Sequence, residues 1–256
     1  YSHLELIQRL MNKLFLFWGT EMNRITYAPY YSGLPVNTNW KKQEGSYIKI
    51  LEIIHEHYAD MILKHSKVFS LRFDLSWPKD RSVIFDPKQI YVFHENLTKD
   101  LNRNYPILSS DGKIEESATR YTRKVDPRII KVYEMGQKSG KPHVHGLLLV
   151  NGNAKDSSAD LYARIERQWA NVLGLKDAKG LVDYCNRRGP NSYMICRNDR
   201  EFEKQWGKAF YQASYLAKVK DKAGLPKGHW LVSATRLPRD AKTAFNINNN
   251  NPSDEV

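Results

Sequence analysis

The chain has 256 residues and a formal net charge of +12, from 40 Lys and Arg against 28 Asp and Glu. A hydrophobic content of 41% excludes wholesale disorder, and at about 150 residues per domain the length allows one to two domains. The two cysteines cannot build a disulfide framework or a zinc site, so the sequence favours a soluble protein of a reducing cell interior. The excess of positive charge favours nucleic acid as the partner.

The first part of the chain predicts two helices, a loop and a strand. Leu4–Phe17 has helical apolar spacing, and its apolar run is too short for a transmembrane helix or a signal peptide, so no membrane contact is expected. Tyr27–Trp40 is rich in Tyr, Pro, Gly and Asn and predicts a loop. Ser46–Ser66 carries apolar residues at helical spacing. Val68–Trp77 alternates apolar and polar residues, which predicts a strand with Arg72 on its polar face.

The middle of the chain predicts a β-hairpin. A helix over Pro87–Asn104 and a polar loop over Ser109–Thr119 precede it. Arg128–Met135 and His143–Val150 then read as strands on either side of the turn-rich Gly136–Pro142. Two such runs with a short glycine-containing connection indicate an antiparallel pair.

The last part of the chain predicts two helices and a short strand. The helices cover Leu161–Leu173 and Asp199–Lys220, and the strand covers Gly180–Cys185, followed by a loop over Cys185–Asn191. Strands joined by hairpins and helices indicate the α+β class, with a central antiparallel sheet flanked by helices.

The composition divides the chain into three parts. We expect an N-terminal helical and loop extension over residues 1–45, one α+β domain over residues 46–238 and a disordered polar tail over residues 239–256.

The run Gly136–Lys141 resembles a phosphate-binding loop, but three residues separate its glycines where four are needed, and Pro142 replaces the Ser or Thr that holds Mg²⁺. No nucleotide cofactor is therefore expected.

His143 and His145 lie two residues apart, so on a strand both side chains point to the same face. If the hairpin turns at Lys138–Ser139, Glu134 lies directly opposite His143. Two imidazoles and one carboxylate with open positions suit a divalent ion such as Mn²⁺ or Mg²⁺ that polarises a phosphate oxygen. A pair of satisfied or half-exposed histidines is the simpler alternative.

Tyr211, Tyr215 and Lys218 fall on one face of the last predicted helix. A phenol is a poor nucleophile near its usual pKa of about 10, and a nearby ammonium or a metal-bound phosphate favours the phenolate. An amphipathic stripe without catalytic function has the same pattern, and the chain contains 15 tyrosines.

The order of these parts resembles the HUH endonucleases, which include rolling-circle replication initiators, relaxases and related transposases. The apolar strand Phe69–Pro78, the run His143-Val-His145-Gly-Leu-Leu-Leu and the run Tyr215-Leu-Ala-Lys218 are similar to the three motifs of that superfamily. The chain looks most like the replication initiators of filamentous bacteriophages (inoviruses). Some initiators carry two tyrosines four residues apart, but Ser214 stands where the doubled motif often has Lys.

The resemblance implies an RRM-like palm and metal-dependent nicking and rejoining of single-stranded DNA through a 5′-phosphotyrosine. It implies Tyr215 as the nucleophile, with Tyr211 as a candidate second one. Lys218 would help to position Tyr215 and balance the developing negative charge. The implied partners are single-stranded or extruded origin DNA and a separate helicase, in the cytoplasm of a bacterial host. Arg72, Arg187 and Arg188 are candidates for contact with DNA phosphates, against the alternative of solvated arginines.

Three alternatives remain open at this stage. The chain could be a single-domain HUH transposase. It could also be a relaxase, although relaxases usually carry their tyrosine ahead of the histidines and this chain carries it after them. It could also be a nucleic-acid-binding regulator on the same palm, which needs neither metal nor Tyr215. A structural zinc protein is weakly supported, because no closed set of four ligands can be assembled.

Overall fold

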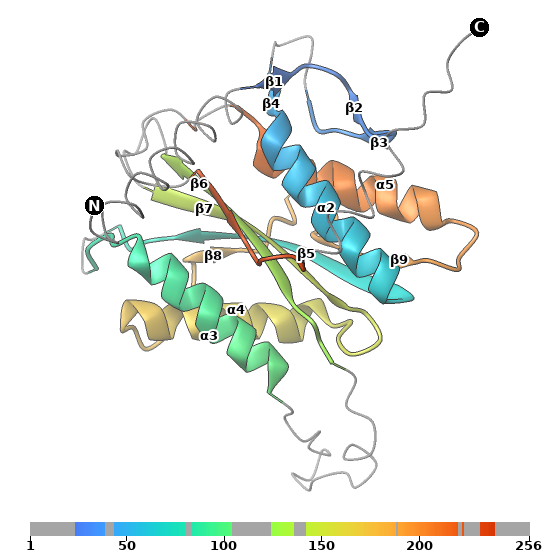
Figure 1. Ribbon diagram of the computed structural model, residues 1–256. Coiled ribbons are helices and arrows are strands. Elements are labelled where there is room, and N and C mark those ends of the chain that lie inside the picture. The colour runs from blue at the N-terminus through green and yellow to red at the C-terminus, as the bar shows by residue number, and fades with distance from the viewer. Residues whose placement is uncertain are drawn as a thin grey trace, which may run out of the picture.

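The computed structural model of the chain (Figure 1) describes residues 24–38, 44–79, 83–103, 124–135, 142–187, 189–219, 222 and 231–238. Six strands form its main sheet: β5 (Lys67–Ser76), β6 (Arg128–Met135), β7 (Pro142–Asn151), β8 (Val182–Asp183), β9 (Ser192–Cys196) and β10 (Val232–Ala234). The order is β10-β6-β7-β5-β8, with β9 also paired to β5, and every pairing is antiparallel. This is the predicted α+β class.

Helices cover both faces of the sheet. They are α2 (Ile48–Lys64), α3 (Lys88–Asn102), α4 (Ser158–Leu173), α5 (Phe202–Ala213) and the 3₁₀ helix η3 (Ser214–Ala217). Figure 1 shows α3 and α4 below the sheet and α2 and α5 above it. None of these helices, within the described ranges, is long and apolar enough to cross a membrane.

Two small strand pairs lie at the start of the described chain. β1 (Ile25–Thr26) pairs with β4 (Ser46–Tyr47), and β2 (Tyr30–Tyr31) pairs with β3 (Leu34–Pro35). The predicted loop over Tyr27–Trp40 therefore contains a short hairpin. Its turn is made by Ser32 and Gly33, both with positive φ, a conformation that glycine adopts without cost.

The central strands are buried on both faces because each face is covered by helices. On one face Leu71, Phe73 and Leu148 join the apolar cluster of α3 and α4. On the other face Leu147 and Leu149 join the cluster of α2, α5 and η3. The predicted alternation of β5 is confirmed, and so is the hairpin register, with Glu134 opposite His143.

The predicted helix over Asp199–Lys220 is wrong at its C-terminal end. α5 stops at Ala213 and η3 follows. Ser214 explains the break, because its hydroxyl donates to the Tyr211 carbonyl and accepts from the Asn37 amide, each at 2.8 Å. A serine that bonds to the backbone in this way competes with regular helix. The chain then turns away, and Lys218 forms a bridge to Ser46.

Strands β9 and β10 were not predicted, since five- and three-residue segments carry little periodic signal. The structure shortens the predicted strand over Gly180–Cys185 to β8. The predicted helix over Leu4–Phe17, the loop over Ser109–Thr119, the turn of the hairpin and the tail over residues 239–256 lie outside the described residues.

Lys131 is a charged residue within the core on the α3 face of the sheet. It is 2% exposed, and its Nζ lies 3.4 Å from the carbonyl oxygen of Ile90. Burial lowers the pKa of Lys131 to about 7. Burial and the charge of Lys131 lower the pKa of His94 to about 4, so His94 stays neutral where Lys131 titrates.

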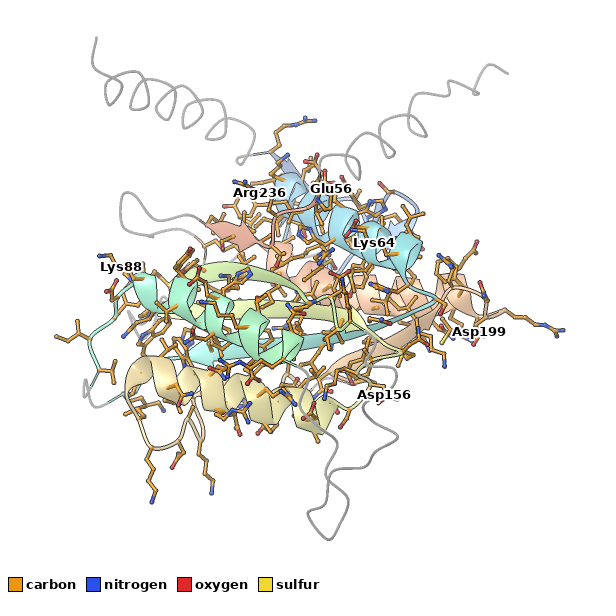
Figure 2. The ribbon with its side chains drawn as sticks, turned by 60° about the horizontal axis from the view of Figure 1, so that its bottom comes forward. Glu56, Lys64, Lys88, Asp156, Asp199 and Arg236 are labelled. Carbon is orange, nitrogen blue, oxygen red and sulfur yellow. The ribbon has the colours of Figure 1, made fainter. Side chains whose placement is uncertain are left out.

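Between about pH 7 and pH 10 the unfolded chain therefore binds more protons at this lysine than the folded chain, and stability rises with pH. We expect Lys131→Met to raise the free energy of unfolding near neutral pH by about 1–4 kcal/mol and to flatten this pH dependence. Urea unfolding at several pH values measures both effects. Lys88→Met, at the exposed start of α3 (Figure 2), is the control, and an equal response of the two variants would contradict the prediction.

Candidate active site

The polar residues of the central strands meet on one face of the sheet, the face that α5 and η3 cover. The register places Asp74 of β5 opposite His145 of β7, and Arg72 lies two residues before Asp74 on the same strand, so both side chains share this face. On the other side of β7, His143 pairs with Glu134. Four predicted site residues, on three neighbouring strands, are thus brought to one end of this face.

His145 lies between two carboxylates. Its Nε2 is 2.7 Å from Glu134 Oε2, and its Nδ1 is 2.8 Å from Asp74 Oδ1. Asp74 also accepts from the Arg72 guanidinium, whose Nη2 lies 3.2 Å from Asp74 Oδ2. The imidazole is therefore fixed in orientation from both sides.

These contacts set the protonation of the site. Burial by itself lowers the pKa of His145, but the charges and hydrogen bonds of Asp74 and Glu134 outweigh it and raise the pKa above its ordinary value. Burial raises the pKa of each carboxyl group, but the His145 contacts prevail and hold both pKa values below the usual range. Burial and the neighbouring charge of His145 lower the pKa of His143. The two carboxylates thus favour the charged form of His145, whereas burial and the charge of His145 favour the neutral form of His143.

Lys222 is a further cation at this site. Its ammonium is buried and lies 3.6 Å from Glu134 Oε2. Periodicity could not have identified Lys222, because this residue belongs to no helix or strand among the described residues. Asp74 could have been found as a neighbour of Arg72 on the polar face of its strand, but only the pairing of β5 with β7 places it against His145.

Tyr215, on η3, closes the site from above the sheet. Its ring packs edge-on against His145, with the ring centroids 5.5 Å apart. The guanidinium carbon of Arg72 lies 4.0 Å from the centroid of the Tyr215 ring, and Lys218 Nζ lies 5.1 Å from it. Lys218 also lies 3.8 Å from Glu44. The predicted nucleophile and its helper are thus brought to the histidine pair.

A hollow of about 240 Å³ opens beside Tyr215, lined by Arg72, Asp74, Asp183, Cys185, Arg187 and Tyr215. Arg187 is at its rim, with a side chain that is 84% exposed and 3.0 Å from Asp183. Burial, followed by the charge of Asp74, raises the pKa of the Cys185 thiol, so this thiol stays protonated near neutral pH and is a poor nucleophile. Arg188 lies outside the described residues.

Tyr211 does not line this hollow. It is 46% exposed and lines a different one, together with Pro35 and Tyr193. The prediction that Tyr211, Tyr215 and Lys218 share one helical face is wrong. The α-helix ends at Ala213, so Tyr215 lies on the 3₁₀ turn and Lys218 lies beyond it.

The donor set fits a divalent ion by its chemistry. His145 Nε2 and Glu134 Oε2 already converge, His143 lies across from Glu134, and Asp74 holds the second nitrogen of His145. A carboxylate on the far nitrogen of a ligand histidine is the usual support in metal centres. Within the described residues, however, no three His, Cys, Asp or Glu side chains converge as a ready metal-binding group. Glu134, His143 and His145 are the residues that would hold such an ion.

The chain belongs to the YagK/YfjJ C-terminal domain family, because the family model matches residues 32–227. Comparison with curated proteins and with solved structures gives no match. The matched region includes the three central strands, α5, η3 and Lys222. All the site residues described above therefore fall within the family domain.

We expect Asp74→Asn to lower the pKa of His145 toward its ordinary value, because one of the two carboxylates that stabilise the imidazolium is removed. The titration of the imidazole resonances by NMR measures this change. Asp183→Asn is the matched control, since Asp183 lines the same hollow but pairs with Arg187. Equal shifts of the His145 pKa in the two variants would contradict the prediction. They would show that the overall electrostatic field of the hollow, and not the Asp74 contact, determines this pKa.

Proposed function

We propose that this protein is a DNA endonuclease and strand transferase of the HUH type, which acts as a rolling-circle replication initiator. The observation that carries the proposal is the position of Tyr215, whose ring packs against His145 and the Arg72 guanidinium at the edge of an open hollow. Its substrate would be single-stranded or extruded origin DNA. The sheet and its helices would then form the RRM-like palm of that superfamily. The protein would act in the way of the inovirus replication initiators.

In the proposed reaction the Tyr215 oxygen attacks the scissile phosphorus. The phenolic oxygen gives up its proton and forms a bond to phosphorus, and the bond from phosphorus to the 3′ oxygen breaks. The 3′ oxygen takes up a proton, which leaves a free 3′-hydroxyl and a 5′-phosphotyrosine. Attack by the 3′-hydroxyl reverses these steps, so the strand is rejoined without a nucleotide cofactor, and unwinding is left to a separate helicase.

The cations around Tyr215 suit this chemistry. Arg72 lies over the ring and Lys218 lies close to it, so both favour the phenolate and the negative charge of the transition state. Arg187, exposed at the rim, is placed to attract a phosphate into the hollow. Because Asp74 fixes the Arg72 guanidinium, little reorganisation is needed when charge develops.

Glu134, His143 and His145 would hold the divalent ion, which when bound would polarise a non-bridging oxygen of the phosphate. Asp74 would keep His145 in the tautomer that presents Nε2. Lys222, buried near Glu134, would offset the negative charge that Glu134 retains.

A second candidate is a non-catalytic DNA-binding regulator on the same fold. It is favoured by the ion pairs themselves, since each carboxylate contacts His145 and a second cation lies near each, Arg72 at Asp74 and Lys222 at Glu134. A single-domain transposase shares the proposed chemistry and differs only in the DNA on which it acts.

We expect wild-type protein with Mn²⁺ and labelled single-stranded origin-region DNA to form an SDS-resistant adduct. Tyr215→Phe should abolish the adduct, because the phenolic oxygen is the atom that bonds to phosphorus. Tyr211→Phe should retain it, since Tyr211 lines a different hollow. Addition of EDTA should prevent formation of the adduct with wild-type protein.

An adduct that survives in Tyr215→Phe and is lost in Tyr211→Phe would move the nucleophile to the other tyrosine. Metal-independent binding without any adduct, on DNA that carries the authentic origin, would favour the non-catalytic regulator.

We expect Arg72→Ala to lower the single-turnover rate of adduct formation by about 100-fold or more, the usual effect of removing one preorganised donor at a developing charge. Arg72→Lys should be intermediate, because an ammonium keeps the charge but loses the planar stacking on Tyr215. Arg187→Ala is the matched control and should change DNA affinity and its salt dependence more than the rate. Equal rates for Arg72→Ala and wild type would refute the assigned role.

A further inference from the structure

A second hollow, of about 380 Å³, lies between α5, β9 and the β2–β3 hairpin. Tyr193, Tyr211 and Pro35 line it with apolar and aromatic surface, and Gly207 contributes backbone where a side chain would reduce the space. Its volume is at the lower end of the range of about 300–1,000 Å³ for small-molecule sites. Tyr211 is 46% exposed, so part of its side chain is accessible to a ligand.

Two lysines of α5 stand at this hollow. Lys204 and Lys208 are four residues apart and therefore share one side of the helix. Both are exposed, and Lys204 pairs with Glu201. Glu203 also lines the hollow, and a carboxylate of this kind can accept a hydrogen bond from the exocyclic amino group of a base.

We infer that this hollow is a nucleobase-stacking site for single-stranded DNA, an inference that rests on the proposed function. Aromatic side chains beside cations are the arrangement by which proteins hold single strands, with the base on a ring and the phosphate near an ammonium. Here Tyr211 supplies the ring and Lys208 the ammonium. An apolar protein ligand would not need the lysines, whereas a nucleotide uses both features.

The position of the hollow relative to Tyr215 supports this occupant. Tyr211 precedes Tyr215 by four residues, and Gln212 lies between them in the sequence. Gln212 Nε2 donates to the carbonyl of Pro190, which in turn lies between Arg187 of the first hollow and Tyr193 of the second in the sequence. A strand with its phosphate at Tyr215 would pass this contact and deliver a neighbouring base to Tyr211. Tyr211 is then a stacking platform and not a second nucleophile.

The test measures DNA binding in the Tyr215→Phe protein, where cleavage cannot interfere. Oligonucleotides carry one 2-aminopurine at successive positions, so that its fluorescence is quenched where the base stacks on an aromatic ring. Tyr211→Ala should remove the quenching at one position and weaken binding by about 5- to 100-fold. Tyr211→Phe should leave both unchanged, because phenylalanine retains the ring.

Tyr91→Ala is the matched control, since Tyr91 is an exposed tyrosine on α3, across the sheet from α5. Thermal unfolding checks that the variants are folded, and Lys208→Gln provides a second test through a reduced salt dependence of binding. Unchanged binding and quenching in Tyr211→Ala, or equal losses in Tyr211→Phe and Tyr211→Ala, would overturn the inference.

Failure of this inference is distinguishable from failure of the proposed function. A Tyr215-dependent adduct in wild-type protein, combined with no effect of Tyr211→Ala on binding, would overturn the stacking site alone. Position-specific quenching that requires the Tyr211 ring, combined with no adduct on any origin DNA, would support the stacking site and overturn the nuclease activity alone.

Discussion

The candidate site depends on the register of three neighbouring strands. Antiparallel pairing of β5 and β6 with β7 puts Asp74 on one side of His145 and brings Glu134 close on the other. A slip of one residue in either pair would turn the polar side chains to the opposite face. The two carboxylates therefore contact His145 only in this register, so the backbone hydrogen bonds that form the sheet also position the site.

The opposite face of the sheet supports this register. Gly146 directly follows His145 and lies opposite Phe73, and the Phe73 ring occupies the space that any side chain at Gly146 would need. Phe73 in turn packs on Phe93 of α3, with ring centroids 6.1 Å apart. A tightly packed core transmits strain, so a larger residue at position 146 would disturb the neighbouring His145 and its contacts on the other face.

The sequence alone predicts much of the fold and most of the residues that gather at the candidate site. Turn residues locate the hairpin, and the hairpin register places Glu134 opposite His143, so this contact needs only local information. Asp74 lies in a strand that pairs with β7 from about 70 residues away, and alternation identifies its face but not its partner. Lys222 follows no period at all. Short edge strands such as β9 escape prediction because tertiary pairing, and not propensity, stabilises them.

The two tyrosines show how equal spacing can lead to different environments. Helical spacing alone places Tyr211 and Tyr215 together, but Ser214 ends the α-helix between them through its bonds to Tyr211 and Asn37. The tighter 3₁₀ turn carries Tyr215 over His145 and Arg72, whereas Tyr211 stays on the outer surface of α5. The charges that would activate a phenol gather around Tyr215, and the apolar surface that would hold a base gathers around Tyr211. One serine thus separates a site suited to phosphate chemistry from a site suited to stacking.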